Sequence, residues 1–477
     1  MHLRNCLRIF LGLFLVASSV AAVSAAVKLP AVIGDNMVLQ QGQPLPIWGW
    51  ADAGEEVTVT LSNSPQRYVA QADQDGRWKV ILDSLKTGSH LDLTVKGASG
   101  NSITVKNVLV GEVWICSGQS NMEMGVQACQ NAKEEIAKAN HPEIRLFHIP
   151  HAKPREPVKD VQSAWAACTP KSVCMSGGGS WGGFSAAAYY FGRHLHKELG
   201  VPVGLIQATW GGTCAESWTS RSALEAQPAL KSLLKDGDST VLYNGMIAPV
   251  IPFGIRGAIW YQGESNADRA YQYRTLFPLM IADWRAQWGQ GDFPFGFVQI
   301  APYRYKRADP RNCPELQEAQ LLTLKTVPNT GMAVTVDIGD AKDIHPKNKQ
   351  DVGRRLALWA LAKVYGRQLV YSGPIYKSMQ LDGNKIRLRF DHVGSGLASL
   401  DGKPLNEFTI AGEDQQFLPA MATIEGDEVV VYSDQITNPV AVRFAWRDDT
   451  APNLGNKEGL PTSPFRTDQW KGATEGK

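Results

Sequence analysis

Short runs of alternating hydrophobic and polar residues fill the chain from Val27 to about Lys106. Turn signals such as Asp73-Gln74-Asp75-Gly76 separate the runs, and no segment of helical spacing intervenes. Alternation with a period of two indicates half-buried β-strands. The predicted strands cover residues 31–32, 46–49, 57–61, 78–82 and 91–95. Residues 27–107 are therefore expected to form a small β-sandwich domain.

The pattern changes between residues 108 and 368, where apolar runs alternate with segments of helical spacing. The predicted strands are 108–116, 203–209, 255–261, 295–300 and 332–338, and the predicted helices are 185–199, 276–288, 314–324 and 350–364. Buried strands that alternate with amphipathic helices predict an α/β fold, in which helices cover both faces of a parallel sheet. Active sites in such sheets lie beyond the carboxyl ends of the strands.

Strand patterns return in the last part of the chain, for example at 385–390 and 429–432. Residues 369–477 are therefore expected to form a second β-rich domain. The polar tail from Lys471 is expected to fray.

The first residues have the layout of a cleavable secretory signal. Arg4 and Arg8 precede an apolar run from Ile9 to Val20, and small residues follow at 23–26. This run is shorter than the roughly 18 apolar residues that span a bilayer. We expect residues 1–26 to be a signal peptide, the protein to be secreted or periplasmic, and no membrane attachment to remain after cleavage.

Composition narrows the classes of partner. A formal net charge of +2 in 477 residues does not indicate a basic surface that would bind nucleic acid or an anionic membrane, so neutral polymers or small molecules are expected as partners instead.

An oxidising compartment would permit disulfides among the cysteines that follow the signal, but their connectivity stays open. Those cysteines are Cys116, Cys129, Cys168, Cys174, Cys214 and Cys313, and Cys168 and Cys174 are the closest pair in sequence. They form no C-x-x-C pairs, so no metal site is expected.

A serine follows the first predicted strand of the central sheet. The apolar run 113–116 leads directly into Ser117-Gly118-Gln119-Ser120, which displays Ser120 at the edge of the sheet. A serine hydroxyl is a weak nucleophile and needs a base, together with donors that hold the oxyanion. Candidate donors follow the next two strands: the backbone N–H at Gly211 and the side-chain amide of Gln262.

The candidate base is His345, which lies beyond the strand 332–338 and ahead of the last helix. Asp343 lies two residues before it and could orient the imidazole. Asp340 and Asp337 are the competing acids, and a backbone carbonyl could also orient the ring.

Two other patterns receive less weight as candidate sites. Gly237-Asp238-Ser239 follows a charged segment and is interpreted as a loop, and Glu264 with Glu112 would suit a glycosidase only at the right separation.

Four blocks in order resemble the sialate O-acetylesterase family, a branch of the SGNH (GDSL) hydrolases. They are Ser117–Met124, Trp210-Gly211-Gly212-Thr213, Trp260–Asn266 and Asp343-Ile344-His345-Pro346. The resemblance implies a flavodoxin-like three-layer α/β/α hydrolase domain between β domains. It also implies Ser120 as nucleophile, His345 as base, and an oxyanion hole formed by the Ser120 amide, Gly211 and Gln262. The superfamily usually has Asn where Gln262 stands and an Asp three residues before the His, whereas Asp343 is two residues away.

The implied reaction is two-step acyl transfer without a cofactor, acting on an O-acetylated carbohydrate. Sialic acid is the first expected acetyl carrier, and xylan or another plant glycan is the alternative. A catalytically inert carbohydrate-binding protein is the competing class. The sequence does not indicate an oligomeric state.

Overall fold

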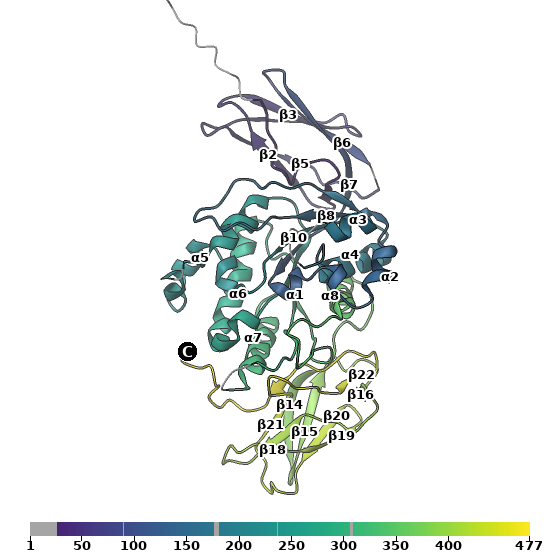
Figure 1. Ribbon diagram of the computed structural model, residues 1–477, viewed down its shortest axis with the longest axis vertical. Helices are drawn as coiled ribbons and strands as arrows, with labels where there is room; N and C mark the ends of the chain where they lie inside the picture. Colours follow the sequence, from purple (N-terminus) through teal and green to yellow (C-terminus); the bar gives the residue numbers. More distant parts are fainter. Residues whose placement is uncertain (1–25, 89, 176–180, 236, 306–308) are drawn as a thin grey trace, which may run out of the picture.

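The computed structural model describes residues 26–88, 90–175, 181–235, 237–305 and 309–477. The predicted signal peptide lies outside these residues, apart from Ala26. Figure 1 shows an elongated molecule with a central α/β body and β-rich portions at its two ends. None of the helices in the described ranges is long and apolar enough to cross a membrane.

The N-terminal β-rich portion is built from short antiparallel strands. They are β2 (Leu45–Trp50), β3 (Glu56–Leu61), β4 (Arg67–Gln71), β5 (Arg77–Leu82) and β6 (Leu91–Gly97), with β2 paired to β5 and β3 lying between β4 and β6. Exposed and buried residues alternate along β5, as the period of two predicted. Residues 31–32 form a turn instead of the predicted strand.

One long strand, β7 (Ser102–Gly118), joins this portion to the α/β body. Its first half pairs antiparallel with β6, and its second half pairs parallel with β10 (Val203–Thr209) and β11 (Gly257–Tyr261). The short strand β1 (Val38–Gln40) also pairs with β7 in parallel. The strand predicted at 108–116 is therefore the inner part of a longer one.

The central sheet is mixed, in the order β13-β12-β11-β7-β10-β8-β9. Its strands are parallel except for β9 (Ala166–Cys168), which runs antiparallel to β8 (His141–His148). The remaining strands are β12 (Phe295–Val298) and β13 (Thr330–Ala333), so the predicted strand 332–338 ends earlier than expected. The chain places β8 and β10 on one side of β7 and β11 to β13 on the other. The ends of β7, β10 and β11 therefore meet where the strand order reverses, which is where α/β sheets bind ligands.

Helices cover both faces of this sheet, as predicted (Figure 1). Phe295 and Phe297 of β12 contact Phe277 of α6 (Ala270–Trp288), whereas a Cβ on the intervening Gly296 would lie 2.5 Å from the Trp359 ring of α8 (Lys349–Lys363). Neighbouring residues of a strand point to opposite faces, so α6 and α8 lie on opposite sides. α4 (Ala186–Leu199) packs with α8, and α7 (Asn312–Thr326) packs with α6.

Short helical segments complete the α/β body. The α-helices are α1 (Ser120–Glu123), α2 (Ala132–Ala137), α3 (Pro170–Met175) and α5 (Arg221–Ala226). The 3-10 and π turns are η1 (Val126–Ala128), η2 (Ala215–Trp218), η3 (Lys231–Lys235), η4 (Tyr243–Ile247), η5 (Ala248–Val250) and η6 (Glu264–Arg269).

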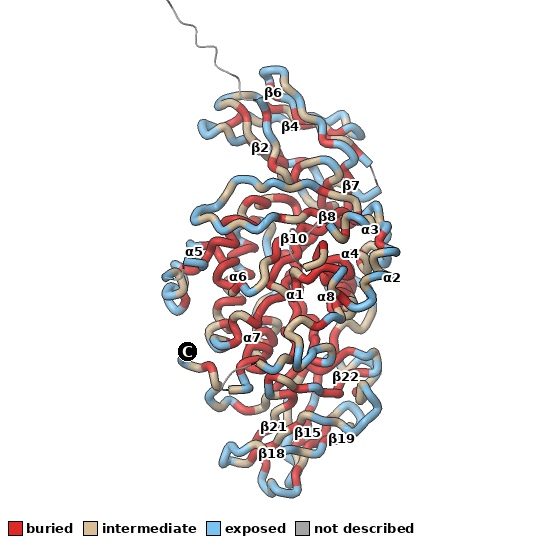
Figure 2. The backbone as a smooth tube through the Cα atoms, viewed as in Figure 1, coloured by how far each residue is buried: buried red, intermediate tan, exposed pale blue. Residues whose placement is uncertain are grey.

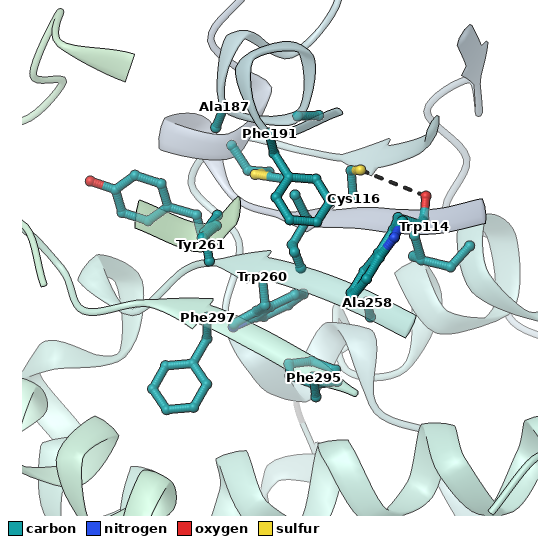
Figure 3. Close-up of a cluster of buried hydrophobic side chains, with 14 of the residues drawn as sticks. Trp114, Cys116, Ala187, Phe191, Ala258, Trp260, Tyr261, Phe295 and Phe297 are labelled. Atoms are coloured by element: carbon teal, nitrogen blue, oxygen red, sulfur yellow. Dashed lines mark hydrogen bonds between the residues drawn. The ribbon is translucent and has the colours of Figure 1, made fainter. Parts of the chain in front are cut away.

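The core is continuous through the central sheet, where buried residues gather in Figure 2. Trp114 of β7 packs edge-on against Phe191 of α4, with ring centroids 5.0 Å apart (Figure 3). Trp260 of β11 is fully buried and packs edge-on against Trp284 of α6 at 5.8 Å. Several tryptophans are therefore core residues rather than sugar-binding surface.

The C-terminal portion consists of small antiparallel sheets. Its strands are β14 (Ile375–Asp382), β15 (Lys385–Asp391), β16 (Leu397–Ser399), β17 (Phe408–Ala411), β18 (Leu418–Pro419), β19 (Met421–Glu425), β20 (Glu428–Tyr432), β21 (Ala441–Phe444), β22 (Leu454–Asn456) and β23 (Phe465–Arg466). The prediction of a frayed tail is wrong. Thr474 is fully buried and donates through its hydroxyl to Glu315 of α7 at 2.5 Å, which ties the tail to the α/β body.

The six cysteines after residue 26 all lie in the described part of the chain, and none of them is disulfide-bonded. Cys168 is buried and Cys174 is half-buried, and this pair, the closest in sequence, is not bonded.

Candidate active site

Ser120 lies at the carboxyl end of β7, as the sequence predicts. β7 ends at Gly118, where φ is +140° and a Cβ would lie 2.2 Å from the carbonyl oxygen of Tyr261. Only glycine fits this turn, which delivers Ser120 to the first position of α1. Ser120 opens into a cavity of about 710 Å³ whose wall also includes Gly211, Glu264, Tyr305 and His345.

The structure brings His345 to Ser120, although 225 residues separate them in sequence. His345 Nε2 lies 3.0 Å from Ser120 Oγ, within hydrogen-bond reach. The rings of Trp181 and His345 pack nearly perpendicular to each other, with centroids 4.3 Å apart. Burial lowers the pKa of His345 below its ordinary value, which keeps the ring neutral and able to accept the serine proton.

Asp343 is the nearest of the three candidate acids to His345. Its Oδ1 lies 3.6 Å from His345 Nδ1, beyond a good hydrogen bond, and accepts the backbone N–H of His345 at 2.9 Å. Asp337 is bound to Arg355 at 2.6 Å, and Asp340 accepts the backbone N–H of Lys342 at 2.8 Å. Asp343, the acid of the expected triad, is therefore only in loose contact with the His345 ring.

Gly211 lies beside Ser120, but its N–H is occupied. A Cβ on Gly211 would lie 3.2 Å from the Ser120 Cβ, and the Gly211 N–H donates to Glu123 Oε2 at 2.6 Å. Glu123 also contacts His151 Nε2 at 3.2 Å, and this hydrogen bond raises the pKa of His151. His151 stacks on Trp210 with ring centroids 4.1 Å apart.

Glu123 and His151 were not predicted as site residues. Glu123 could have been found from its position, because a residue three after Ser120 shares the same face of a helical turn. His151 lies in a loop, and no sequence signal points to its contact with Glu123.

Gln262, the second predicted oxyanion donor, bonds to neighbouring protein groups in this structure. The side chain is fully buried, and its amide donates to the carbonyl of Thr213 at 3.1 Å and to Asn266 Oδ1 at 2.6 Å. Its Oε1 accepts from the hydroxyl of Tyr273 at 2.9 Å. Both amide hydrogens are thus engaged away from Ser120, so Gln262 supports the wall of the site instead of donating into it.

The family follows from comparison with known proteins. The family model described as carbohydrate esterase, sialic acid-specific acetylesterase matches residues 110–362, which is more than half of the chain and includes Ser120 and His345. The chain belongs to this family. It is a carboxylic ester hydrolase.

Relatives of this esterase agree with that assignment. The chain is 31% identical to the sialate O-acetylesterase of Mus musculus over 86% of this chain and 88% of the relative. It is 30% identical to the human sialate O-acetylesterase over 92% of each. The crystal structure of a carbohydrate acetylesterase from Xanthomonas citri superposes with a TM-score of 0.86 at 40% identity, covering 93% of this chain and all of that one. The mixed α/β fold is consistent with an SGNH-like carbohydrate esterase.

The carboxylates Glu264 and Glu112 do not form a glycosidase pair in this esterase. Glu112 pairs with the first residue of β10, whereas Gly118 pairs with the last, so Glu112 lies about 20 Å down β7 from the site. There it binds Arg256 at 2.7 Å. Glu264 lines the cavity and accepts from Asn121 at 2.6 Å, and burial raises its pKa. The separation exceeds the roughly 5–10 Å that glycosidases use.

Proposed function

We propose that this esterase hydrolyses the O-acetyl ester of a sialic acid by two-step acyl transfer through Ser120. The observation that carries the proposal is the 3.0 Å contact between Ser120 Oγ and His345 Nε2 at the end of β7. The names of the mouse and human relatives support sialic acid as the acetyl carrier.

The first step forms an acetyl-enzyme. His345 takes the hydroxyl proton as Ser120 Oγ attacks the acetyl carbonyl, and it then returns the proton to the departing sugar oxygen. Negative charge develops on the carbonyl oxygen and needs donors fixed in advance. The Ser120 amide suits this role because it is the first N–H of α1 and has no acceptor among the described residues.

Gly211 supplies a second donor once Glu123 moves aside. The carboxylate of Glu123 holds the Gly211 N–H at the place where an oxyanion beside Ser120 would bind. The ester oxygen must therefore displace Glu123 before attack. In the second step His345 activates a water molecule, which releases acetate and restores Ser120.

We propose secretion or export to the periplasm through the predicted signal 1–26, and a division into domains at 27–107, 108–368 and 369–477. O-acetylated glycans outside the cytoplasm would then be accessible to the site. Immunodetection of the tagged chain in cell fractions, with N-terminal sequencing of the exported form, tests the signal and its cleavage site.

The substrate is tested by acetate release from O-acetylated sialic acid and from acetylated xylan, with Ser120→Ala as the matched control. We expect release from the sialic acid by the wild type and a loss of several orders of magnitude in the variant. Faster release from xylan would replace the proposed sugar with a plant glycan. Glycan binding without any acetate release would support the inert carbohydrate-binding class.

A further inference from the structure

Lys349 occupies a position that is unusual for a lysine. It is the first residue of α8, where the positive end of the helix dipole disfavours a cation, and its side chain is fully buried. Lysine is almost never fully buried unless it is paired. Specific contacts must therefore offset both the unfavourable helix dipole and the burial of the charge.

The contacts of the Lys349 ammonium group lead to the two neighbours of His345. Lys349 Nζ donates to the carbonyl of Pro346 at 2.7 Å and to Asn121 Oδ1 at 2.7 Å. Asn121 in turn donates through Nδ2 to the carbonyl of Ile344 at 3.0 Å. The residues before and after His345 are thus both held by one buried cation, directly on one side and through Asn121 on the other.

These hydrogen bonds, from Lys349 to Pro346 and through Asn121 to Ile344, form a relay that is also joined to the nucleophile. Asn121 follows Ser120 in α1 and is fully buried, and its Nδ2 also donates to Glu264 at 2.6 Å. The chain on both sides of His345 is thereby fixed to the end of β7 that carries Ser120. The acid that would ordinarily orient the imidazole is loose by comparison, because Asp343 lies 3.6 Å from the ring.

We propose that Lys349 is a positioning residue, which holds the His345 segment against Ser120 through Pro346 and Asn121. This inference rests on the proposed function, in which His345 is the base. Lys349 touches neither substrate nor the reacting atoms. Its role is to fix the distance between Ser120 Oγ and His345 Nε2, and misplacement by about 1 Å can lower a rate about 100-fold.

The test compares Lys349→Met, which keeps the length of the side chain and removes its donors, with the wild type. We expect kcat for acetyl-ester hydrolysis to fall about 10- to 100-fold with KM changed less than about twofold. Lys347→Met is the matched control, because Lys347 lies two residues away and is exposed. A purely structural role predicts a lower melting temperature with unchanged kcat at temperatures where the variant is folded, and that outcome would overturn the proposal.

A double-mutant cycle adds a readout of the relay itself. Asn121→Leu should lower kcat as well, and the double variant with Lys349→Met should be little worse than the more impaired single variant, because both changes free the same segment. Losses that multiply would contradict a shared relay. If Lys349→Met does not fold by circular dichroism, Lys349→Gln, which retains one donor group, should show a smaller fall in kcat, and wild-type kcat in that variant would overturn the proposal.

Labelling of Ser120 with a fluorophosphonate tests the positioning role of Lys349 independently of the proposed substrate. The labelling reaction requires the Ser120–His345 contact but no sugar. Slow labelling in Lys349→Met beside fast labelling in the wild type supports the positioning role even if the sialic acid substrate proves wrong. Equal labelling rates would overturn it.

Discussion

His345 Nδ1 lies 3.6 Å from Asp343 Oδ1, while the other ring nitrogen of His345 lies 3.0 Å from Ser120 Oγ. The base is therefore firmly in contact with the nucleophile and only loosely in contact with its acid. The side chain of Asp343 is also 45% exposed, so water screens its charge. The orientation of His345 must come mainly from the chain around it.

Asp343→Asn should therefore be a mild change. The acid of a tightly bonded Ser-His-Asp triad is worth about four orders of magnitude in kcat, whereas here we expect a loss below about tenfold. Asp343 raises the pKa of His345, so its neutralisation should also move the acid limb of the pH profile to lower pH. Asp340→Asn is the control. A loss of about a thousandfold or more would show that Asp343 closes onto His345 during catalysis.

The pH dependence of the wild type follows from the burial of His345. Burial disfavours the protonated imidazole and lowers its pKa below the ordinary 6.5. The base is neutral and active above that pKa and is lost as the pH falls through it. The acid limb of kcat/KM should therefore have its midpoint below pH 6.5. Rates on a soluble acetyl ester measure it, and a midpoint above that value would contradict the burial argument.

Glu123→Gln should weaken the hydrogen bond that keeps the Gly211 N–H from the oxyanion. Hydrogen bonds to a carboxylate are about twice as strong as those to a neutral amide oxygen, and a carboxylate at this point also repels the developing oxyanion. We expect kcat/KM on a small acetyl ester to rise about three- to tenfold, with no change in the exposed-site control Glu134→Gln. A fall of more than about tenfold would instead give Glu123 a direct part in binding or catalysis.

Thr474→Val should destabilise the protein although it lies far from Ser120 in sequence. Glu315 is 3% exposed and would lose the hydroxyl donor of Thr474, which leaves a buried carboxylate less well satisfied. We expect the free energy of unfolding to fall by about 1–3 kcal/mol in denaturant titrations. Lys471→Ala, at an exposed position of the same tail, should leave stability unchanged.

Elements with a complete local signal were predicted well from the sequence. β10 covers the predicted run 203–209, and α4 begins after the N-cap Ser185 and ends before Gly200, which adopts the left-handed conformation. Capping and apolar periodicity are local, so they can be read from neighbouring residues. The sequence also predicted that Ser120, Gly211 and His345 lie together, and all three line one cavity, since each follows a strand of one sheet and strand ends converge.

Features set by distant contacts could not be predicted. Gln262 follows β11 as expected, but the direction of its amide is decided by Thr213, 49 residues away. The full length of β7 depends on pairing with β6, which the polar residues near Asn107 conceal. The side-chain partner of Lys349 likewise is Asn121, 228 residues away, so the sequence around Lys349 did not indicate its burial.

The central claim is that Ser120 carries the acetyl group during turnover. The most direct measurement is mass spectrometry of the esterase quenched during reaction with an activated acetyl ester, with fragmentation to separate Ser120 from Ser117 on the same peptide. We predict one added acetyl group on Ser120, which is absent from Ser120→Ala and from unreacted enzyme. An acetyl group on another residue, or turnover that persists in Ser120→Ala at the wild-type rate, would contradict the account.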